Sequence, residues 1–414
     1  INFWPYTLSI LPKYFPLHQF MFYKEGEPIR CTAAVAYSTN KPLVLEQIIV
    51  DPPQEHEVRV KVTNTALCRT DLFTLKGLNP EGKFPCVLGH EGSGIVESCG
   101  SKVETIKKGD HVLLLYIPEC GHCADCKSEK SNLCSVIKAT QAQGVMPQGS
   151  SRLHNLENET LWHFMGCSSF SQYTVVSDIS CVKIRDDAPL DKICLLGCGV
   201  TTGFGAPIAK GVKAGDRVAI FGSGTVGLSV VQSCSQLKCS QVIVVDVQDN
   251  KREWALGFGA TDFINPQKIP KNKSLLQTLI DKSGGDGFDF TFDCTGSTSV
   301  MRTALESCRK GWGTSVIIGL AGAGKEISTL PYNLIVGRSW EGCAFGGVKG
   351  RSELPTLVER YMNNEIKLDE YITNKRPLKE INEALKELED GLVLKNCVGH
   401  RRRFTFSYVA DGKG

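Results

Sequence analysis

Residues 217–246 read RVAIFGSGTVGLSVVQSCSQLKCSQVIVVD. An apolar segment leads into the motif G-x-G-x-x-G, formed by Gly222, Gly224 and Gly227, which opens a helical segment, and a second apolar segment ends at Asp246. The motif alone is weak evidence in a chain with 41 glycines. The full order of strand, glycine turn, helix, strand and terminal acid within about 30 residues is typical of a dinucleotide-binding unit. The stretch therefore predicts an α/β domain that binds a dinucleotide at the glycine turn.

Each residue of the motif has a physical role in that prediction. Gly222 permits the tight turn, Gly224 lets backbone amides approach a pyrophosphate, and Gly227 lets the helix pack on the sheet. The helix N-terminus supplies partial positive charge for the phosphates. Asp246 is expected to accept hydrogen bonds from the adenosine ribose hydroxyls and to repel a 2′-phosphate, which favours NAD over NADP. Lys251 follows closely enough to reach the same ribose.

Strands and helices alternate around this turn. The pattern predicts strands at 216–221, 241–245, 263–264, 288–292 and 314–318, with helices at 225–236 and 251–258. That order predicts a doubly wound parallel sheet. Residues 33–112 instead contain short β-rich runs broken by Pro and Gly, which predict an all-β, partly barrel-like domain. The mixed segment 351–395 is expected to fold back onto this first domain.

The composition bounds the class of protein. A chain of 414 residues suggests two domains, and 42% hydrophobic with 22% charged residues is typical of a soluble globular protein. No apolar run reaches the roughly 18 residues of a membrane span. With a net charge of +3 and one basic cluster, 400–403, we expect a small-molecule partner and neither nucleic acid nor membrane. Residues 1–30 are apolar but broken by prolines, which predicts a disordered extension rather than a secretory signal.

The chain has 18 cysteines and no convincing signal peptide, which favours a reducing compartment and a cytoplasmic protein. Four of them, Cys120, Cys123, Cys126 and Cys134, occur within the segment IPECGHCADCKSEKSNLC. Adjacent disulfides would be awkward at this spacing, and a redox C-x-x-C would not need four cysteines. Four thiolates can instead close around one zinc ion, which leaves no open position for a substrate. The segment therefore predicts a structural zinc site.

A second set of candidate ligands is weaker when each residue is taken alone. Cys68, His90 and Cys198 are far apart in the sequence, and an isolated Cys or His is more often a core or structural residue. Five stretches change this weighting because together they resemble one family: LGHEGSGIVES, CGHCADCKSEKSNLC, SRLHNLENETLWHF, LLGCGVTTGFGA and FGATDFINP. From about residue 31 to 390 the sequence resembles the zinc-dependent medium-chain alcohol dehydrogenases. Within that superfamily it is most similar to the class III, glutathione-dependent formaldehyde dehydrogenases.

The resemblance implies a domain division. A GroES-like catalytic domain would span residues 31–200 and 345–400, and an NAD-binding Rossmann domain would span 201–344. Residues 1–30 and 401–414 would lie outside both domains.

The resemblance also implies a catalytic zinc site. Its ligands would be Cys68, His90 and Cys198, with Glu91 close behind the metal and Asp71 orienting His90. A fourth, open position would accept water or an alcohol. Zinc would lower the pKa of the alcohol hydroxyl, which would lose its proton before hydride transfer to the nicotinamide.

In this family a threonine hydroxyl relays the alcohol proton, and Thr70 matches it. Some relatives end the proton chain with a histidine, where this sequence has Phe73, so we expect water there. The resemblance further implies cofactor contacts by four residues: Arg69, Thr202, Val226 and Lys395. Lys395 would replace a family arginine that touches the cofactor phosphate. Because of this departure two segments stay candidates for the last strand of the first domain, the one around Lys395 and FTFSYV in the tail.

The predicted substrate residues depart in part from the glutathione-dependent pattern. Glu81 and Lys310 match it, whereas Asn79 replaces an aspartate, Ser135 a glutamine and Lys138 an arginine. Lysine keeps the charge but lacks the bidentate fork that suits a carboxylate. The alternative is that the three replaced residues form an ordinary solvated rim.

Three functions therefore stay open at this point. The first is NAD-dependent oxidation of S-(hydroxymethyl)glutathione and of primary, especially long-chain, alcohols. The second is a general alcohol dehydrogenase without a glutathione requirement, and the third is a non-catalytic zinc- and NAD-binding protein. Relatives are homodimers joined through the last strand of the nucleotide domain, which we expect near Thr314–Leu320.

Overall fold

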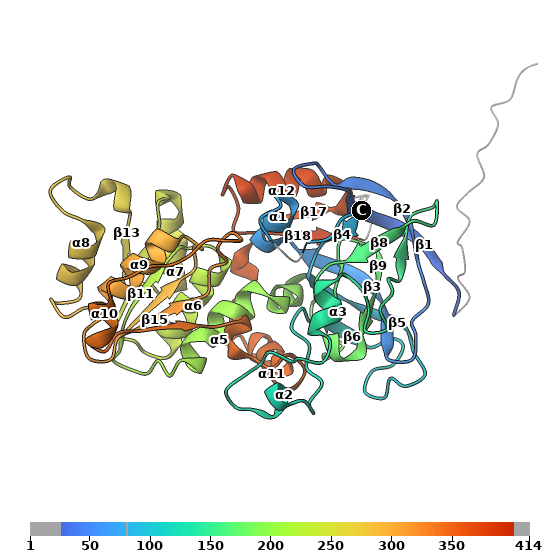
Figure 1. Cartoon of the computed structure of the whole chain (residues 1–414), viewed down its shortest axis with the longest axis horizontal. Helices are drawn as coiled ribbons and strands as arrows, with labels where there is room; N and C mark the ends of the chain where they lie inside the picture. The colour runs from blue at the N-terminus through green and yellow to red at the C-terminus, as the bar shows by residue number, and fades with distance from the viewer. Residues whose placement is uncertain (1–25, 80–81, 401–414) are drawn as a thin grey trace, which may run out of the picture.

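The computed structural model describes residues 26–79 and 82–400, and two halves lie side by side in it (Figure 1). One half is β-rich and contains both a closed barrel and an open sheet, and the other is built on a parallel sheet. Strand β1 begins at Ile29, inside the segment expected to be an extension. The basic cluster at 401–403 and the FTFSYV segment lie outside the described residues.

The β-rich half follows from short alternating strands separated by Gly and Pro turns. Its barrel has the order β1 (Ile29–Ala36), β2 (Val44–Val50), β7 (Leu153–His154), β8 (Thr160–His163) and β4 (Cys86–Val87). The second sheet has the order β10 (Cys181–Lys183), β6 (His111–Leu114), β5 (Glu91–Cys99), β3 (Glu57–Ala66), β18 (Lys395–Gly399) and β17 (Ile372–Pro377), and β9 (Tyr173–Ser177) also pairs with β3.

Strand β18 is the last strand of the β-rich half. Lys395–Gly399 pairs in parallel with β17 and antiparallel with β3, so the segment after the parallel sheet returns to the first half. The amphipathic helix α12 (Ile381–Glu389) precedes it and packs Ile381, Leu385 and Leu388 into the barrel core. The departure from the family sequence at Lys395 therefore does not prevent the closing strand from forming.

The parallel sheet has the strand order expected of a doubly wound fold. The order is β13 (Asp262–Ile264), β12 (Gln241–Val245), β11 (Arg217–Phe221), β14 (Phe290–Asp293), β15 (Thr314–Ile317) and β16 (Ser339–Gly342). The helices between them are α6 (Thr225–Gln236), α7 (Arg252–Phe258), α8 (Leu275–Lys282), α9 (Thr298–Ser307) and α10 (Pro331–Ile335). Numbered along the chain this is the order 3-2-1-4-5-6, which places a ligand crevice at the carboxyl ends of the central strands.

The sheet corrects one expectation about the edge strand. Residues Thr314–Ile317 form β15, which is hydrogen-bonded to β14 on one side and to β16 on the other. The expectation that the last strand lies near Thr314–Leu320 is therefore wrong, because neither edge of β15 is free to pair. The edge of the sheet is β16, Ser339–Gly342.

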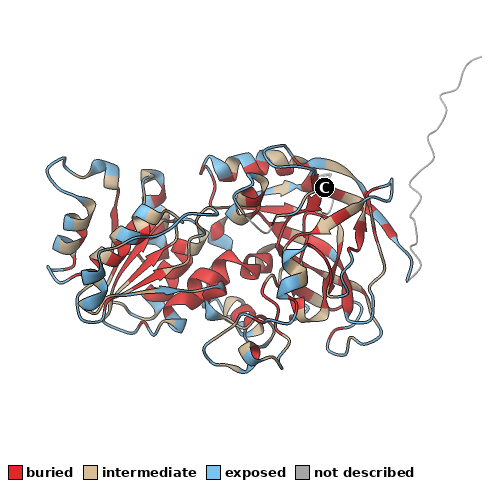
Figure 2. Cartoon of the chain, viewed as in Figure 1, coloured by how far each residue is buried: buried red, intermediate tan, exposed pale blue. Residues whose placement is uncertain are grey.

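A buried helix joins the two halves. Helix α5 (Gly199–Ala209) is buried over most of its length and packs on α6, as Figure 2 shows in red. A Cβ on Gly203 would lie 2.1 Å from Val226 O, so the two helix backbones are in direct contact there. Residues from both halves, including Leu195, Phe204, Leu228 and Phe345, share one apolar core. The halves are thus held together by packing rather than by a flexible linker.

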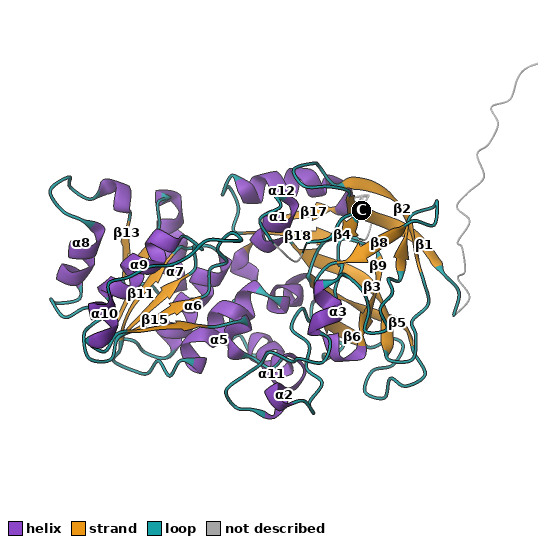
Figure 3. Cartoon of the chain, viewed as in Figure 1, coloured by secondary structure: helices purple, strands orange, loops and turns teal. Residues whose placement is uncertain are grey.

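The remaining helices are short and belong mainly to the β-rich half. They are α1 (Arg69–Leu75), α2 (Ala124–Lys127), α3 (Lys138–Ala142), α4 (Leu190–Ile193) and, after β16, the longer α11 (Gly350–Met362). Around α2 the chain is mostly loop (Figure 3). Among residues 26–79 and 82–400 no single helix is long and apolar enough to cross a membrane, although one bent pair, Leu190–Gly197 with Gly199–Ala209, passes that test by length and composition.

We predict that Gly227→Ala destabilises the protein, whereas Gly257→Ala does not. A Cβ on Gly227 would lie 1.8 Å from Gly222 O, inside any van der Waals contact. The variant should lose about 3 kcal/mol or more of unfolding free energy. Gly257 lies in α7 with nothing within 4 Å of an added Cβ, so alanine should stabilise the protein by about 0.5 kcal/mol. Chemical denaturation of both variants tests this, and equal midpoints would contradict it.

Candidate active site and metal centres

A cavity of about 1580 Å³ runs between the two halves. Residues of α1 and the start of β18 line it from the β-rich half. The glycine turn, the end of β12 and the residues after β15 line it from the parallel sheet. The predicted metal ligands and the predicted nucleotide turn therefore face one shared space.

Cys68, His90 and Cys198 line this cavity, and Glu91 lies close to them. One ligand atom from each lies within 4.8 Å of every other, although the residues come from the start of α1, the loop before β5, β5 itself and the start of α5. The interaction with Cys198 lowers the pKa of the Cys68 thiol, and the same interaction raises the pKa of Cys198. One thiolate is therefore already favoured at this position.

The buried carboxylate of Asp71 fixes the orientation of His90. Its Oδ1 accepts a hydrogen bond from Gly89 N at 3.1 Å and lies 3.1 Å from His90 Nδ1, while its Oδ2 accepts from Cys68 N at 3.0 Å. Burial alone would lower the pKa of His90, but the Asp71 carboxylate outweighs it and holds the pKa well above its ordinary value. With Nδ1 donating to Asp71, Nε2 faces the other ligands, and a cation bound there would take the place of the proton on Nε2.

Two buried polar atoms of this group suit a cation as their partner. His90 Nε2 and Glu91 Oε2 have no hydrogen-bond partner among the described residues. Two cysteine thiolates and one imidazole are a donor set that zinc prefers, and a set of three leaves a position open. Thr70 Oγ1 lies 3.6 Å from Cys68 Sγ, so a hydroxyl stands beside the donors. The chemistry of the donors fits a catalytic zinc ion.

Lys395 makes a contact that sequence reasoning did not anticipate. Its Nζ donates to Glu91 Oε1 at 2.6 Å, and both side chains are almost completely buried. Burial alone would lower the pKa of Lys395, but the Glu91 carboxylate raises it above its ordinary value. Lys395 also lines the cavity, and Thr225 Oγ1 donates to Leu394 O next to it. The side chain therefore lies behind the metal position and beside the glycine turn.

The four clustered cysteines form a second candidate metal site. One Sγ each from Cys120, Cys123, Cys126 and Cys134 lies within 4.8 Å of the others, with Cys120 and Cys126 at 3.8 Å and Cys123 and Cys134 at 4.0 Å. Backbone N–H groups of Cys123 and Cys126 point at sulfur atoms of the set. All four donors are sulfur, which fits a closed structural zinc site.

The glycine turn has the geometry that the motif predicts. Gly222 has a φ of +93°, which favours glycine, and Gly224 faces open space with nothing within 4 Å of an added Cβ. That space is the cavity, so backbone amides at the start of α6 are accessible to a phosphate. Val226, Thr202 and Arg69 also line the cavity.

Asp246 directly follows β12, at the far side of this turn. Its Oδ2 accepts hydrogen bonds from Ser223 N at 2.8 Å and Ser223 Oγ at 2.7 Å, and its Oδ1 accepts from Gln248 N at 3.0 Å. Lys251 Nζ is 3.6 Å from Oδ2. Burial alone would raise the pKa of Asp246, but Lys251 and these donors hold it below its ordinary value. The side chain is therefore ionised at neutral pH.

The predicted substrate residues are not all brought together. Asn79 lines the cavity, and Glu81 lies outside the described residues. Ser135, Lys138 and Lys310 are absent from the walls of this cavity as the described residues form them.

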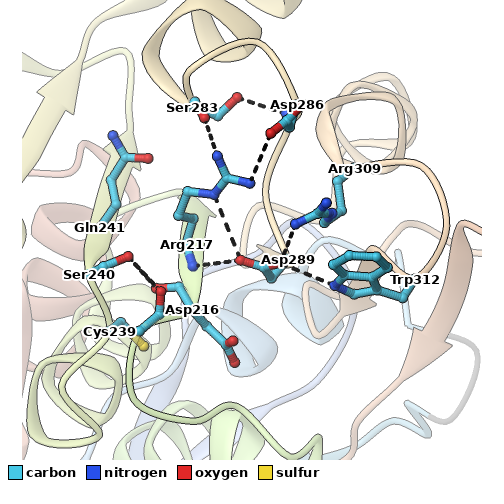
Figure 4. Close-up of polar contacts among 12 residues, drawn as sticks. Asp216, Arg217, Cys239, Ser240, Gln241, Ser283, Asp286, Asp289, Arg309 and Trp312 are labelled. Carbon is cyan, nitrogen blue, oxygen red and sulfur yellow. Dashed lines mark hydrogen bonds and ion pairs between the residues drawn. The ribbon is translucent and has the colours of Figure 1, made fainter.

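Lys310 lies between Arg309 and Trp312, at the amino ends of the parallel strands and away from the glycine turn. Trp312 Nε1 donates to Asp289 Oδ1 at 3.2 Å, and Arg309 stacks on the indole ring (Figure 4). Asp289 also accepts from Arg217 N at the start of β11. These contacts join the amino ends of the strands, and within one chain the Lys310 segment lies at the opposite end of the strands from the cavity.

Three aromatic residues and one methionine at the site were not predicted. Tyr116 packs edge-on against His90, with ring centroids 5.6 Å apart, and Phe164 does so at 5.9 Å. Tyr116 in turn packs edge-on against Phe345 at 5.2 Å, and Met165 lines the cavity beside them. Tyr116 stands two residues after the apolar strand β6, and this was the one available signal that its ring lies at a strand end.

Comparisons with known proteins agree with this geometry. The alcohol dehydrogenase GroES-like domain matches residues 54–186, and the zinc-binding dehydrogenase domain matches residues 225–363. S-(hydroxymethyl)glutathione dehydrogenase of Saccharomyces cerevisiae is 55% identical over 375 residues, which cover 90% of this chain and 97% of the relative. Alcohol dehydrogenase class-3 of Dictyostelium discoideum is 53% identical over 90% of this chain and 99% of its own length.

Solved structures of similar fold come from the same class of enzymes. An alcohol dehydrogenase zinc-binding domain protein from Burkholderia ambifaria is 31% identical, with a TM-score of 0.84 over 91% of this chain and all of that one. Benzyl alcohol dehydrogenase from Acinetobacter calcoaceticus is 29% identical, with a TM-score of 0.82 over 90% and 99%. The chain belongs to the zinc-binding alcohol dehydrogenases. Within that family it groups with the class III enzymes, the S-(hydroxymethyl)glutathione dehydrogenases.

We predict that Asp71→Asn weakens zinc binding at the Cys68–His90–Cys198 site by about 10-fold to 100-fold, because the histidine loses the carboxylate that orients it. Asp51→Asn is the matched control, since Asp51 lies 2.8 Å from His154 Nε2 away from either cluster. When the zinc-loaded proteins are titrated with a chelator, the Asp71 variant should lose one zinc ion at a lower chelator concentration than the Asp51 variant. Equal retention in both variants would contradict this orienting role.

We predict that Asp246→Asn reduces the discrimination between NAD and NADP about 10-fold, since the substitution removes the negative charge that repels a 2′-phosphate. Asp262→Asn is the control, because Asp262 pairs with Lys282 at the start of β13. The ratio of kcat/KM for the two cofactors measures the effect. An unchanged ratio in the Asp246 variant would show that another residue selects the cofactor.

Proposed function

We propose that this protein oxidises S-(hydroxymethyl)glutathione, and primary alcohols with long chains, with NAD as the hydride acceptor. The observation that carries the proposal is the convergence of Cys68, His90 and Cys198 with the glycine turn on one cavity. The relatives named S-(hydroxymethyl)glutathione dehydrogenase support the substrate. We expect two zinc ions per chain, one at this site and one at the four cysteines.

The donors and their surroundings suit alcohol oxidation. A zinc ion held by the two thiolates and His90 supplies Lewis acidity that lowers the pKa of an alcohol, and NAD accepts the hydride. Asp71 keeps His90 in the tautomer that binds through Nε2. Tyr116 and Phe345 exclude water from one side of the site.

Thr70 is the proposed proton relay. Its Oγ1 is 3.6 Å from Cys68 Sγ and lines the cavity, so it can accept the proton of an alcohol that binds beside the thiolate. Phe73 also lines the cavity, but its ring cannot accept or donate a proton. We therefore propose that water takes the proton on from Thr70. Arg69, Thr202, Val226 and Lys395 are the proposed cofactor contacts, with Lys395 acting as the counter-ion of Glu91 as well.

Only some of the predicted substrate residues lie at the cavity. Asn79 lines the cavity, and we propose it as a substrate residue together with Glu81. Lys138 and Lys310 stay predictions, because both lie off the cavity walls in the described part of a single chain. A general alcohol dehydrogenase without glutathione dependence is the alternative that these positions favour.

We also propose a cytoplasmic homodimer. Strand β16 leaves one edge of the parallel sheet without a partner strand among the described residues. Leu330, Tyr332 and Ile335, in and next to α10 beside that edge, are 62%, 62% and 77% exposed, and apolar side chains in such numbers are typical of an interface. The proposed domains remain 31–200 with 345–400, and 201–344, since β18 pairs with β3.

The test is oxidation of formaldehyde by metal-analysed protein with and without glutathione, followed as NADH formation. Because formaldehyde and glutathione combine to the alcohol substrate, we expect the rate to require glutathione, with activity also on octanol and a preference for NAD over NADP. Equal rates without glutathione would favour the general alcohol dehydrogenase. No NADH from any alcohol with zinc-replete protein would favour a non-catalytic role.

Thr70→Ser and Thr70→Ala are matched variants for the same assay. The serine variant keeps the hydroxyl and should keep most of the activity, whereas the alanine variant should lose about 100-fold in kcat. Comparable loss in both variants would argue that Thr70 is needed for packing rather than for proton transfer.

A further inference from the structure

A left-handed turn in the cavity wall has an unusual backbone. Phe345, Gly346 and Gly347 form a short 3-10 element with φ values of +50°, +67° and +73°. Glycine adopts these values easily, but phenylalanine does so only when its surroundings hold it there. Something outside the turn must therefore hold Phe345 in place.

Part of the support comes from α5, on which the turn lies backbone to backbone. A Cβ on Gly346 would be 2.3 Å from Thr201 O, and a Cβ on Gly205 would be 2.4 Å from Gly346 O. Helix α5 begins immediately after Cys198, so the turn rests on the same helix that carries a metal ligand. A shift of the turn is therefore felt close to the catalytic site.

The side chain of Phe345 continues this path toward the metal position. Its ring packs edge-on against Tyr116 at 5.2 Å, and the Tyr116 ring packs edge-on against His90 at 5.6 Å. Phe345 and His90 are both completely buried. Close-packed aromatic contacts of this kind do not tolerate displacement without repacking. The position of the turn thus sets the position of two rings beside the proposed substrate.

The rest of the support comes from the four-cysteine lobe, defined as residues 120–134. Asn132 Nδ2 donates to Ala344 O at 2.9 Å and to Val348 O at 3.1 Å, the two carbonyls on either side of the turn. An amide nitrogen carries two hydrogens, so one side chain bridges both ends. Asn132 stands two residues before Cys134, a proposed ligand of the structural zinc.

Two further contacts tie the lobe to the same segment. Lys349 Nζ donates to Cys126 O at 2.7 Å. Glu119, which precedes Cys120, accepts from Arg351 N at 2.7 Å and Ser352 N at 2.9 Å at the start of α11. The lobe also lines the cavity through residues 129–133, next to Ala344–Val348.

We propose that Asn132 is a positioning residue that clamps the turn 344–348, so that the four-cysteine zinc lobe sets the width of the substrate cavity as well as supporting the fold. The substrate part of this inference rests on the proposed alcohol-oxidising function. The clamp itself concerns the protein alone and can be tested without a substrate. It predicts that damage to the lobe changes the binding of bulky substrates before it changes the chemistry.

The experiment compares Asn132→Ala and Asn132→Asp with the control Asn382→Ala, all as zinc-loaded holoenzymes. Asn382 also makes two hydrogen bonds to backbone, both to Leu43 at 2.9 Å, but it lies off the cavity walls. We expect KM for octanol and for S-(hydroxymethyl)glutathione to rise about fivefold in both Asn132 variants, with a smaller change in kcat. The aspartate keeps the shape but cannot donate to two carbonyls, so it should not rescue the effect.

A second readout does not depend on activity. Amide hydrogen exchange within residues 343–352 should become at least about threefold faster in the Asn132 variants and stay unchanged in the control. Unchanged exchange there would overturn the clamp, whatever the substrate. Faster exchange with unchanged KM for every alcohol would overturn the link to the cavity, and failure of glutathione dependence alone would count only against the proposed substrate.

Discussion

The catalytic half of the molecule depends on one buried carboxylate. Asp71 meets Cys68 N, Gly89 N and His90 Nδ1, and each contact fixes a different part of the proposed metal site. Cys68 is held through its own backbone N–H, and His90 is held through its ring nitrogen and the N–H of the preceding Gly89, so the first turn of α1 and the loop before β5 cannot move apart. A neutral side chain could not accept all three hydrogen bonds with comparable strength, since charge-assisted bonds are about twice as strong as neutral ones.

The third ligand is brought in by packing and not by hydrogen bonds to this carboxylate. Cys198 stands at the start of α5, whose glycines let it lie directly on α6 and on the turn at Gly346. Because α6 starts at the glycine turn, the same helix pair fixes the distance between the metal position and the nucleotide site. Hydride transfer needs the two reacting carbons within about 3.5 Å, so this distance is a functional constraint as well as a packing one.

Much of this arrangement could be predicted from sequence, but for different reasons in different places. The glycine turn, Asp246 and the four cysteines are local patterns whose spacing carries the chemistry, and the structure brings the four cysteines together and places the turn and Asp246 on the cavity. Cys68, His90 and Cys198 are distant in sequence and became convincing only through resemblance. The pairing of Lys395 with Glu91, the packing of Tyr116 on Phe345 and the clamp by Asn132 had no local signal, because each joins residues at least 200 positions apart. The edge strand was misplaced because β15 and β16 are both short and only one of them has an apolar pattern.

The same long-range contacts explain how a metal centre with several charges can be buried. Two thiolates and a zinc ion balance each other, but Glu91 adds a negative charge behind them that would be costly in a low-dielectric interior. Lys395 neutralises that charge at 2.6 Å, and it can do so only because β18 closes the sheet next to β3. A point charge is sufficient for this task, since one carboxylate oxygen is paired and the other faces the metal position. The replacement of a family arginine by lysine is therefore consistent with charge balance, and toward the proposed cofactor phosphate it leaves a point-charge contact in place of the arginine fork.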